Sequence, residues 1–77
     1  MNLRILTFAQ TRTQLGFAEK IVECEPTETP REIFRRIAPQ FDPGQIIRIA
    51  INQEYAHWDQ PVGDATEIAL IPPVSGG

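Results

Sequence analysis

The chain has 77 residues, 42% of them hydrophobic and 22% charged, which is enough for one domain with a modest core. Its formal net charge is −3, and its basic residues, of which only Lys20 is a lysine, are scattered, so it lacks the basic stripe typical of nucleic-acid-binding proteins. The sequence has neither an apolar run of membrane-spanning length nor a secretory signal pattern. We therefore expect a cytoplasmic protein, with neither a membrane nor nucleic acid as a partner.

Two strands separated by a short helix are predicted at the start of the chain. Residues 3–8 are rich in side chains that favour strands. Residues 9–15 are polar and precede Gly16, which stands where a helix C′ glycine belongs, so we expect one or two helical turns there. Residues 17–25 alternate with a period of two, which predicts a strand antiparallel to the first, with one wetter face.

The clearest local signal is the start of a main helix. Thr29, Pro30 and Glu32 provide a hydroxyl at the N-cap, a proline at N1 and a glutamate at N3. Apolar residues then recur at helical spacing on one stripe, and Pro39 ends the run. The stripe consists of Ile33, Phe34, Ile37 and Ala38. Such a stripe must pack against a sheet.

The second half of the chain predicts three more strands, at residues 46–51, 55–58 and 66–71, with turn residues at 41–44, 52–54 and 61–65. This order of elements predicts an α+β domain of the β-grasp class, with a mixed five-stranded sheet packed on one main helix. We expect that domain to span residues 1–71 and to be followed by an extended C-terminal tail at residues 72–77.

The tail combines stiff and featureless residues. Pro72 and Pro73 favour an extended, polyproline-like path that points away from the domain. Gly76 and Gly77 have no side chains and could enter a narrow channel, with the terminal carbonyl carbon open to attack. The tail should therefore carry its carboxylate into a cleft on another protein. The alternative is a frayed terminus or a leftover linker.

A second prediction comes from the alternation of side chains along the first and last strands. If Ile5, Ile68 and Leu70 point toward the main helix, then their neighbours point to a face that a single helix leaves open. Those neighbours are Leu6, Phe8, Ala69 and Ile71. We expect Phe8 and Ile71 to meet at the root of the tail, with Tyr55 nearby, and to form a hydrophobic docking patch. The alternative is a set of scattered apolar residues on the surface.

The chain has few residues suited to catalysis or metal binding. Its single cysteine, Cys24, cannot form an internal disulfide and falls where a small buried hydrophobe is expected. With His57 as the only histidine, the usual Cys/His zinc patterns are missing, and we interpret His57 as a solvated or packing residue. We expect no bound metal and no catalytic machinery within the chain itself.

Three stretches make a family resemblance specific. They are Phe8-Ala9-Gln10 with Arg12 and Leu15-Gly16, then residues 51–55, and above all Leu70 to Gly77, which reads LIPPVSGG. Over essentially its whole length the chain resembles the small subunit of molybdopterin synthase, the MoaD family of ubiquitin-like sulfur carriers. It departs from the family at Thr13, where glutamate is frequent, and at Ala65-Thr66, where Gly-Asp is frequent. If the family glycine aligned with Ala65 has a positive φ, an alanine there would be strained, so we expect Gly63-Asp64 to form the turn instead.

The resemblance implies a function for the tail. An ATP-dependent enzyme would adenylate Gly77, sulfur would replace the adenylate to give a C-terminal thioglycine, and that thiocarboxylate would supply the dithiolene sulfur of molybdopterin during molybdenum cofactor biosynthesis. The resemblance implies no bound cofactor and two partners, the activating enzyme and the large subunit. The carrier and the large subunit would together form a heterotetramer. The other tail residues would lie in a channel of the large subunit, namely Pro72, Pro73, Val74, Ser75 and Gly76. Two alternatives remain: another Gly-Gly carrier, such as the thiamine sulfur carrier or a ubiquitin-like modifier, and a plain interaction module.

Overall fold

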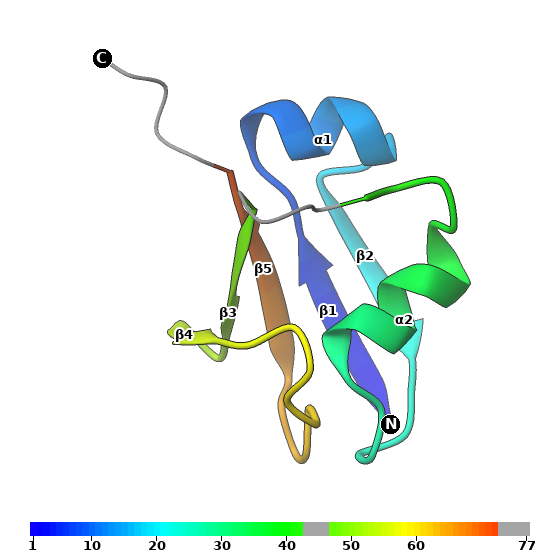
Figure 1. Cartoon of the computed structure of the whole chain (residues 1–77), viewed down its shortest axis with the longest axis vertical. Helices are drawn as coiled ribbons and strands as arrows, with labels where there is room; N and C mark the ends of the chain where they lie inside the picture. The colour runs from blue at the N-terminus through cyan, green and yellow to red at the C-terminus, as the bar shows by residue number, and fades with distance from the viewer. Residues whose placement is uncertain (43–46, 73–77) are drawn as a thin grey trace.

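A computed structural model describes residues 1–42 and 47–72 and shows five strands in one sheet, with the order β2-β1-β5-β3-β4 (Figure 1). The main helix α2 lies over one face of the sheet, and the short helix α1 lies across one of its ends (Figure 1). The elements are β1 (Asn2–Leu6), α1 (Ala9–Leu15), β2 (Glu19–Glu23), α2 (Pro30–Ile37), β3 (Arg48–Ile51), β4 (Glu54–Ala56) and β5 (Glu67–Ile71). The predicted α+β fold, with a mixed five-stranded sheet and one main helix, is confirmed.

The pairing of the strands brings the two ends of the sheet into register. β1 is antiparallel to β2 and parallel to β5, with Leu6 opposite both Glu19 and Ala69. β3 is antiparallel to both β5 and β4. Because β1 and β5 are parallel neighbours, β5 ends beside the point where β1 leads into α1. The last described residue, Pro72, therefore lies at the α1 end of the molecule.

Helix α2 begins as its sequence predicts. The Glu32 backbone N–H donates to Thr29 Oγ1 over 3.2 Å, and the Thr29 backbone N–H donates to Glu32 Oε1 over 2.9 Å. This capping box satisfies two backbone donors that the first turn of a helix would leave unpaired, and Pro30 fills a position that needs no donor. Ile33 and Phe34 on the apolar stripe are buried against the sheet.

One hydrophobic core fills the space between the sheet and α2. Leu3, Ile5, Ile33, Ile49, Ile68 and Leu70 have no exposed surface. Around them, Phe34 packs against the rings of Phe41 and Trp58, with ring centroids 6.1 and 5.6 Å away. The Trp58 indole N–H donates to the Ile47 carbonyl over 2.9 Å, so its polar group is satisfied beside the core.

Two tight turns join the strands of the second half. Asn52 and Gln53 both have positive φ, 50° and 71°, as the short hairpin between β3 and β4 requires. In the loop before β5 the positive φ falls on Gly63, at 61°, and not on Ala65, which is buried at 4% exposure. Gly63 and Asp64 thus form the turn, as expected for a chain that has Ala65-Thr66 where the family frequently has Gly-Asp. Ala65 has no positive φ and is not strained.

Several predicted strands are shorter in the structure. The first strand ends at Leu6 and not at residue 8, because Phe8 becomes the N-cap of α1. The strand predicted at 55–58 spans Glu54–Ala56, because Trp58 turns back onto the core. The strand predicted at 17–25 spans Glu19–Glu23 and the last one starts at Glu67. The strand predicted at 46–51 starts at Arg48. Residue 46, together with residues 43–44 of the turn predicted before it, lies outside the described residues.

Candidate docking face and C-terminal tail

The face of the sheet opposite α2 carries a row of apolar side chains from four strands. Tyr55 pairs with Ala50, Ala50 with Ala69, and Ala69 with Leu6, so these residues form one line across the sheet. Successive side chains of a strand point to opposite faces, and the neighbours of these residues in sequence, including Ile5, Ile49, Ile68 and Leu70, belong to the core on the helix side. The line therefore lies on the uncovered face.

Phe8 and Ile71 continue this surface toward the end of the sheet. Thr7 and Leu70 are almost fully buried, at 1% and 0% exposure, so the next residue on each segment faces the other way. Phe8 is extended, with φ −136° and ψ 150°, and 45% exposed, and Ile71 is partly buried. The structure thus places both on the face opposite α2, as the alternation predicted. We define the open face as Leu6, Phe8, Ala50, Tyr55, Ala69 and Ile71.

The local structure of α1 fixes Phe8 in this position. The Phe8 backbone N–H donates to Thr11 Oγ1 over 3.0 Å, and the Thr11 hydroxyl donates to the Phe8 carbonyl over 2.7 Å. These two bonds close the first turn of α1, and Thr11, which is fully buried, packs that turn against the body of the domain. Gly16, with φ 83°, ends α1 in the left-handed conformation, and its N–H donates to the Arg12 carbonyl over 2.8 Å. The backbone at Phe8 is thereby held while its ring stays exposed.

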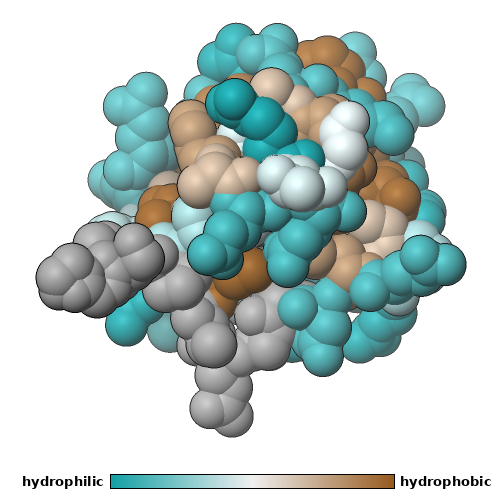
Figure 2. Space-filling model, turned by 90° about the horizontal axis from the view of Figure 1, so that it is seen from above, coloured by the Kyte–Doolittle hydropathy of each residue, from teal (hydrophilic) through white to brown (hydrophobic). Residues whose placement is uncertain are grey.

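Polar groups border the open face. Arg4 and Glu67 are directly opposite each other on β1 and β5 and form an ion pair with a 2.9 Å N–O distance. Arg48 lies opposite Ile71, and Glu19 lies opposite Leu6. An apolar centre with a charged border is the usual layout of a protein interface. At the α1 end of the molecule, which Figure 2 views end-on, hydrophobic residues in brown are interspersed among hydrophilic ones in teal.

The sequence did not identify Ala50 and Arg48 as part of this surface. The alternation along residues 46–51 divides that strand into two sets of side chains, but it does not say which set faces the helix. Only the pairing of Ile49 with Leu70 settles this, and it puts Arg48 and Ala50 on the open face. To assign Arg48 and Ala50 to the open face from the sequence, one would need to know the register of β3 against β5.

The described part of the tail is its first residue. Pro72 is partly buried and follows Ile71 directly. The other predicted tail residues lie outside the described residues, namely Pro73, Val74, Ser75, Gly76 and Gly77. The division into a domain at 1–71 and a tail at 72–77 therefore stays a prediction, as do the roles of the tail residues.

Cys24 and His57 take the places that the sequence predicted for them. Cys24 is 4% exposed and belongs to the core, and this burial, together with the nearby Glu28 carboxylate, raises the pKa of its thiol. A buried thiol with a raised pKa is a poor nucleophile. His57 is exposed. Within residues 1–42 and 47–72, no three His, Cys, Asp or Glu side chains gather closely enough to hold a metal ion.

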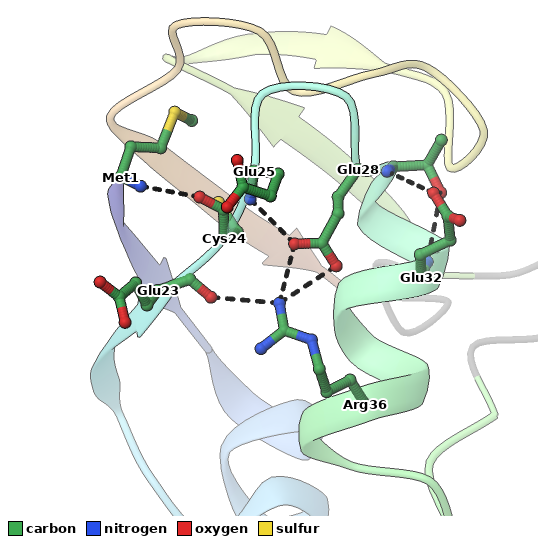
Figure 3. A network of polar contacts seen from close by, with 8 residues as sticks. Met1, Glu23, Cys24, Glu25, Glu28, Glu32 and Arg36 are labelled. Carbon is green, nitrogen blue, oxygen red and sulfur yellow. Dashed lines mark hydrogen bonds and ion pairs between the residues drawn. The ribbon is translucent and has the colours of Figure 1, made fainter.

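A polar network around Arg36 fastens the loop between β2 and α2 (Figure 3). Arg36 Nη2 donates to both Glu28 oxygens, over 3.0 and 3.1 Å, and to the Glu23 carbonyl over 3.1 Å. The Glu25 backbone N–H donates to Glu28 Oε1 over 2.9 Å. This bond, and next the Arg36 guanidinium, lower the pKa of the Glu28 carboxyl group. Every member has a structural partner, so we interpret the network as stabilising the loop.

The fold and the open face define a class of protein, the ubiquitin-like β-grasp domains. Archaeal solved structures of this class superpose well. SAMP1 from Haloferax volcanii gives a TM-score of 0.78 at 21% identity, covering 100% of both chains. A putative molybdopterin converting factor, subunit 1, from Pyrococcus furiosus gives 0.75 at 22% identity, covering 96% of this chain and 99% of that one. At these identities the likeness shows the fold alone.

The sequence places the chain more closely: it belongs to the ThiS family, whose profile matches residues 5–77. The molybdopterin synthase sulfur carrier subunit of Caenorhabditis briggsae is 35% identical over 88 residues, which cover 100% of this chain and 99% of that protein. The subunit of the same name from Escherichia coli is 33% identical over 81 residues, with 97% and 99% covered. The family resemblance predicted from the sequence is confirmed. None of the helices in the described ranges is long and apolar enough to cross a membrane.

Proposed function

We propose that this chain is the sulfur carrier subunit of a molybdopterin synthase. The observation that carries the proposal is its similarity, over nearly the full length of both proteins, to two relatives with that name. The family match runs through Gly77, so it includes the Gly-Gly ending on which a carrier depends. In this role the chain supplies no catalytic side chains, and the partner proteins provide the general acids and bases.

The reacting group is the carboxylate of Gly77. A free carboxylate is a poor electrophile, so it is first adenylated at the expense of ATP, which gives the carbonyl carbon AMP as a leaving group. A sulfur nucleophile then displaces AMP, and the resulting thiocarboxylate presents a soft, nucleophilic sulfur, as a thiolate does. Two such transfers supply the two dithiolene sulfurs of molybdopterin. The carrier holds no bound cofactor, and its one modification is this C-terminal thioglycine.

The open face and the tail divide the work of binding. Phe8, Tyr55 and Ile71 dock the domain on the partner, because the exposed rings of Phe8 and Tyr55 and the exposed part of Ile71 gain from burial at an interface. Pro72 and Pro73 direct the tail away from the domain and reduce the entropy that it loses on insertion. Val74, Ser75 and Gly76 make strand-like backbone contacts in the channel, so that the Gly77 sulfur reaches the precursor.

The activating enzyme and the synthase large subunit are the two partners in this proposal. Both use the same tail, so they bind the carrier in turn. With one carrier at each end of a large-subunit dimer, the synthase is a heterotetramer. We place these steps in the cytoplasm, where ATP is available to the activating enzyme.

The test is the intact mass of the protein after incubation with the activating enzyme of the molybdenum cofactor pathway, ATP and a sulfur donor. The mass should rise by one exchange of oxygen for sulfur, and a variant that lacks Gly77 should not change. The modified protein is then mixed with the synthase large subunit and the cyclic pyranopterin precursor. Molybdopterin should form only with the sulfurated, full-length carrier.

The outcomes separate the alternatives. If sulfur is loaded but reaches only the thiamine thiazole, the chain is a thiamine sulfur carrier. If the chain becomes attached through an isopeptide bond to lysines of other proteins, it is a modifier. If an enzyme preparation that loads its own carrier leaves this chain unchanged, the tail is not a substrate and the carrier function is wrong.

A further inference from the structure

The outer edge of β2 is an unpaired strand edge on the far side of the sheet from Tyr55. β2 comes first in the sheet order, so only β1 lies beside it. The Cys24 N–H donates to the Met1 carbonyl over 2.8 Å, and the Thr7 N–H donates to the Ala18 carbonyl over 3.0 Å. In an antiparallel pair the backbone groups of every second residue point to the partner strand. The groups of Glu19, Ile21 and Glu23 therefore point away from β1.

Most of this edge has no partner within the part of the chain that the structure describes. Arg36 Nη2 donates to the Glu23 carbonyl over 3.1 Å and thereby covers one end of the edge (Figure 3). The outward N–H and C=O groups of Glu19 and Ile21 make no hydrogen bond to another described residue. All three residues are exposed, Ile21 to 57%.

The strand has no proline and no bulge to close its edge, so its charged residues, Glu19, Lys20 and Glu23, are what limits unselective pairing. Residues 19–23 contain no proline or glycine, and their register with β1 is unbroken, so there is no bulge. The side chains of Glu19, Ile21 and Glu23 share one face, because they alternate with Lys20 and the buried Val22. The edge thus offers free backbone groups beside an apolar side chain that has a carboxylate two residues away on either side.

We propose that the β2 edge binds an extended segment of another protein as an added antiparallel strand, with an apolar residue opposite Ile21 and a lysine or arginine opposite each of Glu19 and Glu23. Backbone hydrogen bonds to Ile21 and Glu19 provide the pairing, as in other cases of strand addition. Opposite charges facing each other across two strands favour that partner and that register.

Charge also excludes a second copy of this chain as the occupant. A symmetric antiparallel pair centred on Ile21 would put Glu19 of one copy directly opposite Glu23 of the other, twice. Like charges at directly opposite positions destabilise a strand pair, and each copy carries a net charge of −3. The two glutamates that oppose self-pairing are the ones that favour a basic strand.

The site lies at the edge of the sheet, and its Glu19 borders the open face beside Leu6, but it does not depend on the sulfur carrier function. β2 and β4, which carries Tyr55, are the opposite edges of the sheet. The tail follows β5, in the middle of the sheet order. A strand added to β2 therefore leaves β3 and β4 uncovered.

The experiment uses two disulfide-cyclised hairpin peptides, which are rigid and so lose little entropy on binding. One presents the strand Arg-Thr-Val-Thr-Arg, and the other presents Glu-Thr-Val-Thr-Glu. Each is titrated into the full-length, ¹⁵N-labelled protein, and the backbone amide shifts are followed by NMR. The basic hairpin should shift the amides of Glu19, Ile21 and Glu23 and should bind at least about tenfold more tightly than the acidic one.

Two variants make the test specific. Glu19→Lys combined with Glu23→Lys should reverse the preference in favour of the acidic hairpin. Ile21→Pro removes an outward N–H that no described residue uses, so it should abolish binding while the fold persists. Equal binding of the two hairpins, an unchanged preference in the charge-reversed variant, or shifts centred on Tyr55 would each overturn the proposal. The charge-reversed variant decides the matter even if the proline variant does not fold.

Discussion

The two faces of the sheet are built from alternate residues of the same strands, yet they differ in almost every physical respect. On the face toward α2, Ile5, Ile68 and Leu70 have no exposed surface. One position further along the chain, Leu6, Ala69 and Ile71 are only partly buried, and no helix in the described ranges covers them. One face therefore specifies the fold, and the other is free to evolve as a binding surface.

Truncating one side chain on each face of β5 should give the largest difference in stability between the two faces. Ile68→Ala removes a fully buried side chain and leaves a cavity, so it should lower the free energy of unfolding by about 3 kcal/mol. Ile71→Ala removes the same atoms from a partly buried site on the open face and should cost less than about 1 kcal/mol. Urea unfolding of both variants measures the difference. Equal losses would mean that the open face is also part of the folding core.

The covered face depends on α2, and the start of α2 depends on its cap. Thr29→Ala removes the hydroxyl that accepts from the Glu32 N–H and should lower the free energy of unfolding by about 1 kcal/mol. Thr27→Ala is the matched control, since Thr27 is exposed and lies in the preceding turn. Urea unfolding at neutral pH is again the measurement. A loss as large for Thr27→Ala as for Thr29→Ala would refute the role of the cap.

A smaller effect is expected where Glu28 holds the loop before α2. Its pKa is lowered in the folded protein from an ordinary value of 4.5, so its charge contributes stability that is present above that pH and is lost as the pH falls through the lowered pKa. Glu28→Gln should cost less than about 1 kcal/mol at pH 7, because the ion pair with Arg36 is partly exposed. Thermal unfolding as a function of pH should show the two proteins converging in acid.

The control for this variant is Glu25→Gln. The Glu25 side chain makes no hydrogen bond or ion pair with another described residue, although its backbone N–H donates to Glu28. Its replacement should leave stability unchanged at neutral pH. If the Glu28 variant is as stable as the native protein at pH 7, or if the gap between them persists in strong acid, the network contributes nothing through its charge.

Local signals in the sequence were sufficient for much of the fold. Thr29, Pro30 and Glu32 located the start of α2 because the bonds that begin a helix join residues three positions apart. Gly16 located the end of α1 for a similar reason. The alternation along β1 and β5 assigned Phe8 and Ile71 to the open face, because a strand's two faces follow from parity alone.

Features that depend on contacts between distant segments could not be predicted in this way. The ends of the strands depend on where their neighbours stop, so Phe8 was placed in a strand although it caps α1. Ala50 joins the open face only through its pairing with Ala69 and Tyr55. The edge at Ile21 is exposed because β2 has one neighbour, and a sequence does not state the order of strands in a sheet.

The docking role of the open face can be tested by calorimetry, as the affinity of a synthase large subunit for a variant with Phe8→Ser and Tyr55→Ser whose thermal unfolding is measured alongside. Both rings are exposed, and serine is a favourable N-cap at position 8, so the fold should persist. We expect binding at least about tenfold weaker than that of the native protein. His57→Ser, which removes an exposed ring elsewhere, should bind normally. Native affinity in the double variant would show that the open face has no part in docking.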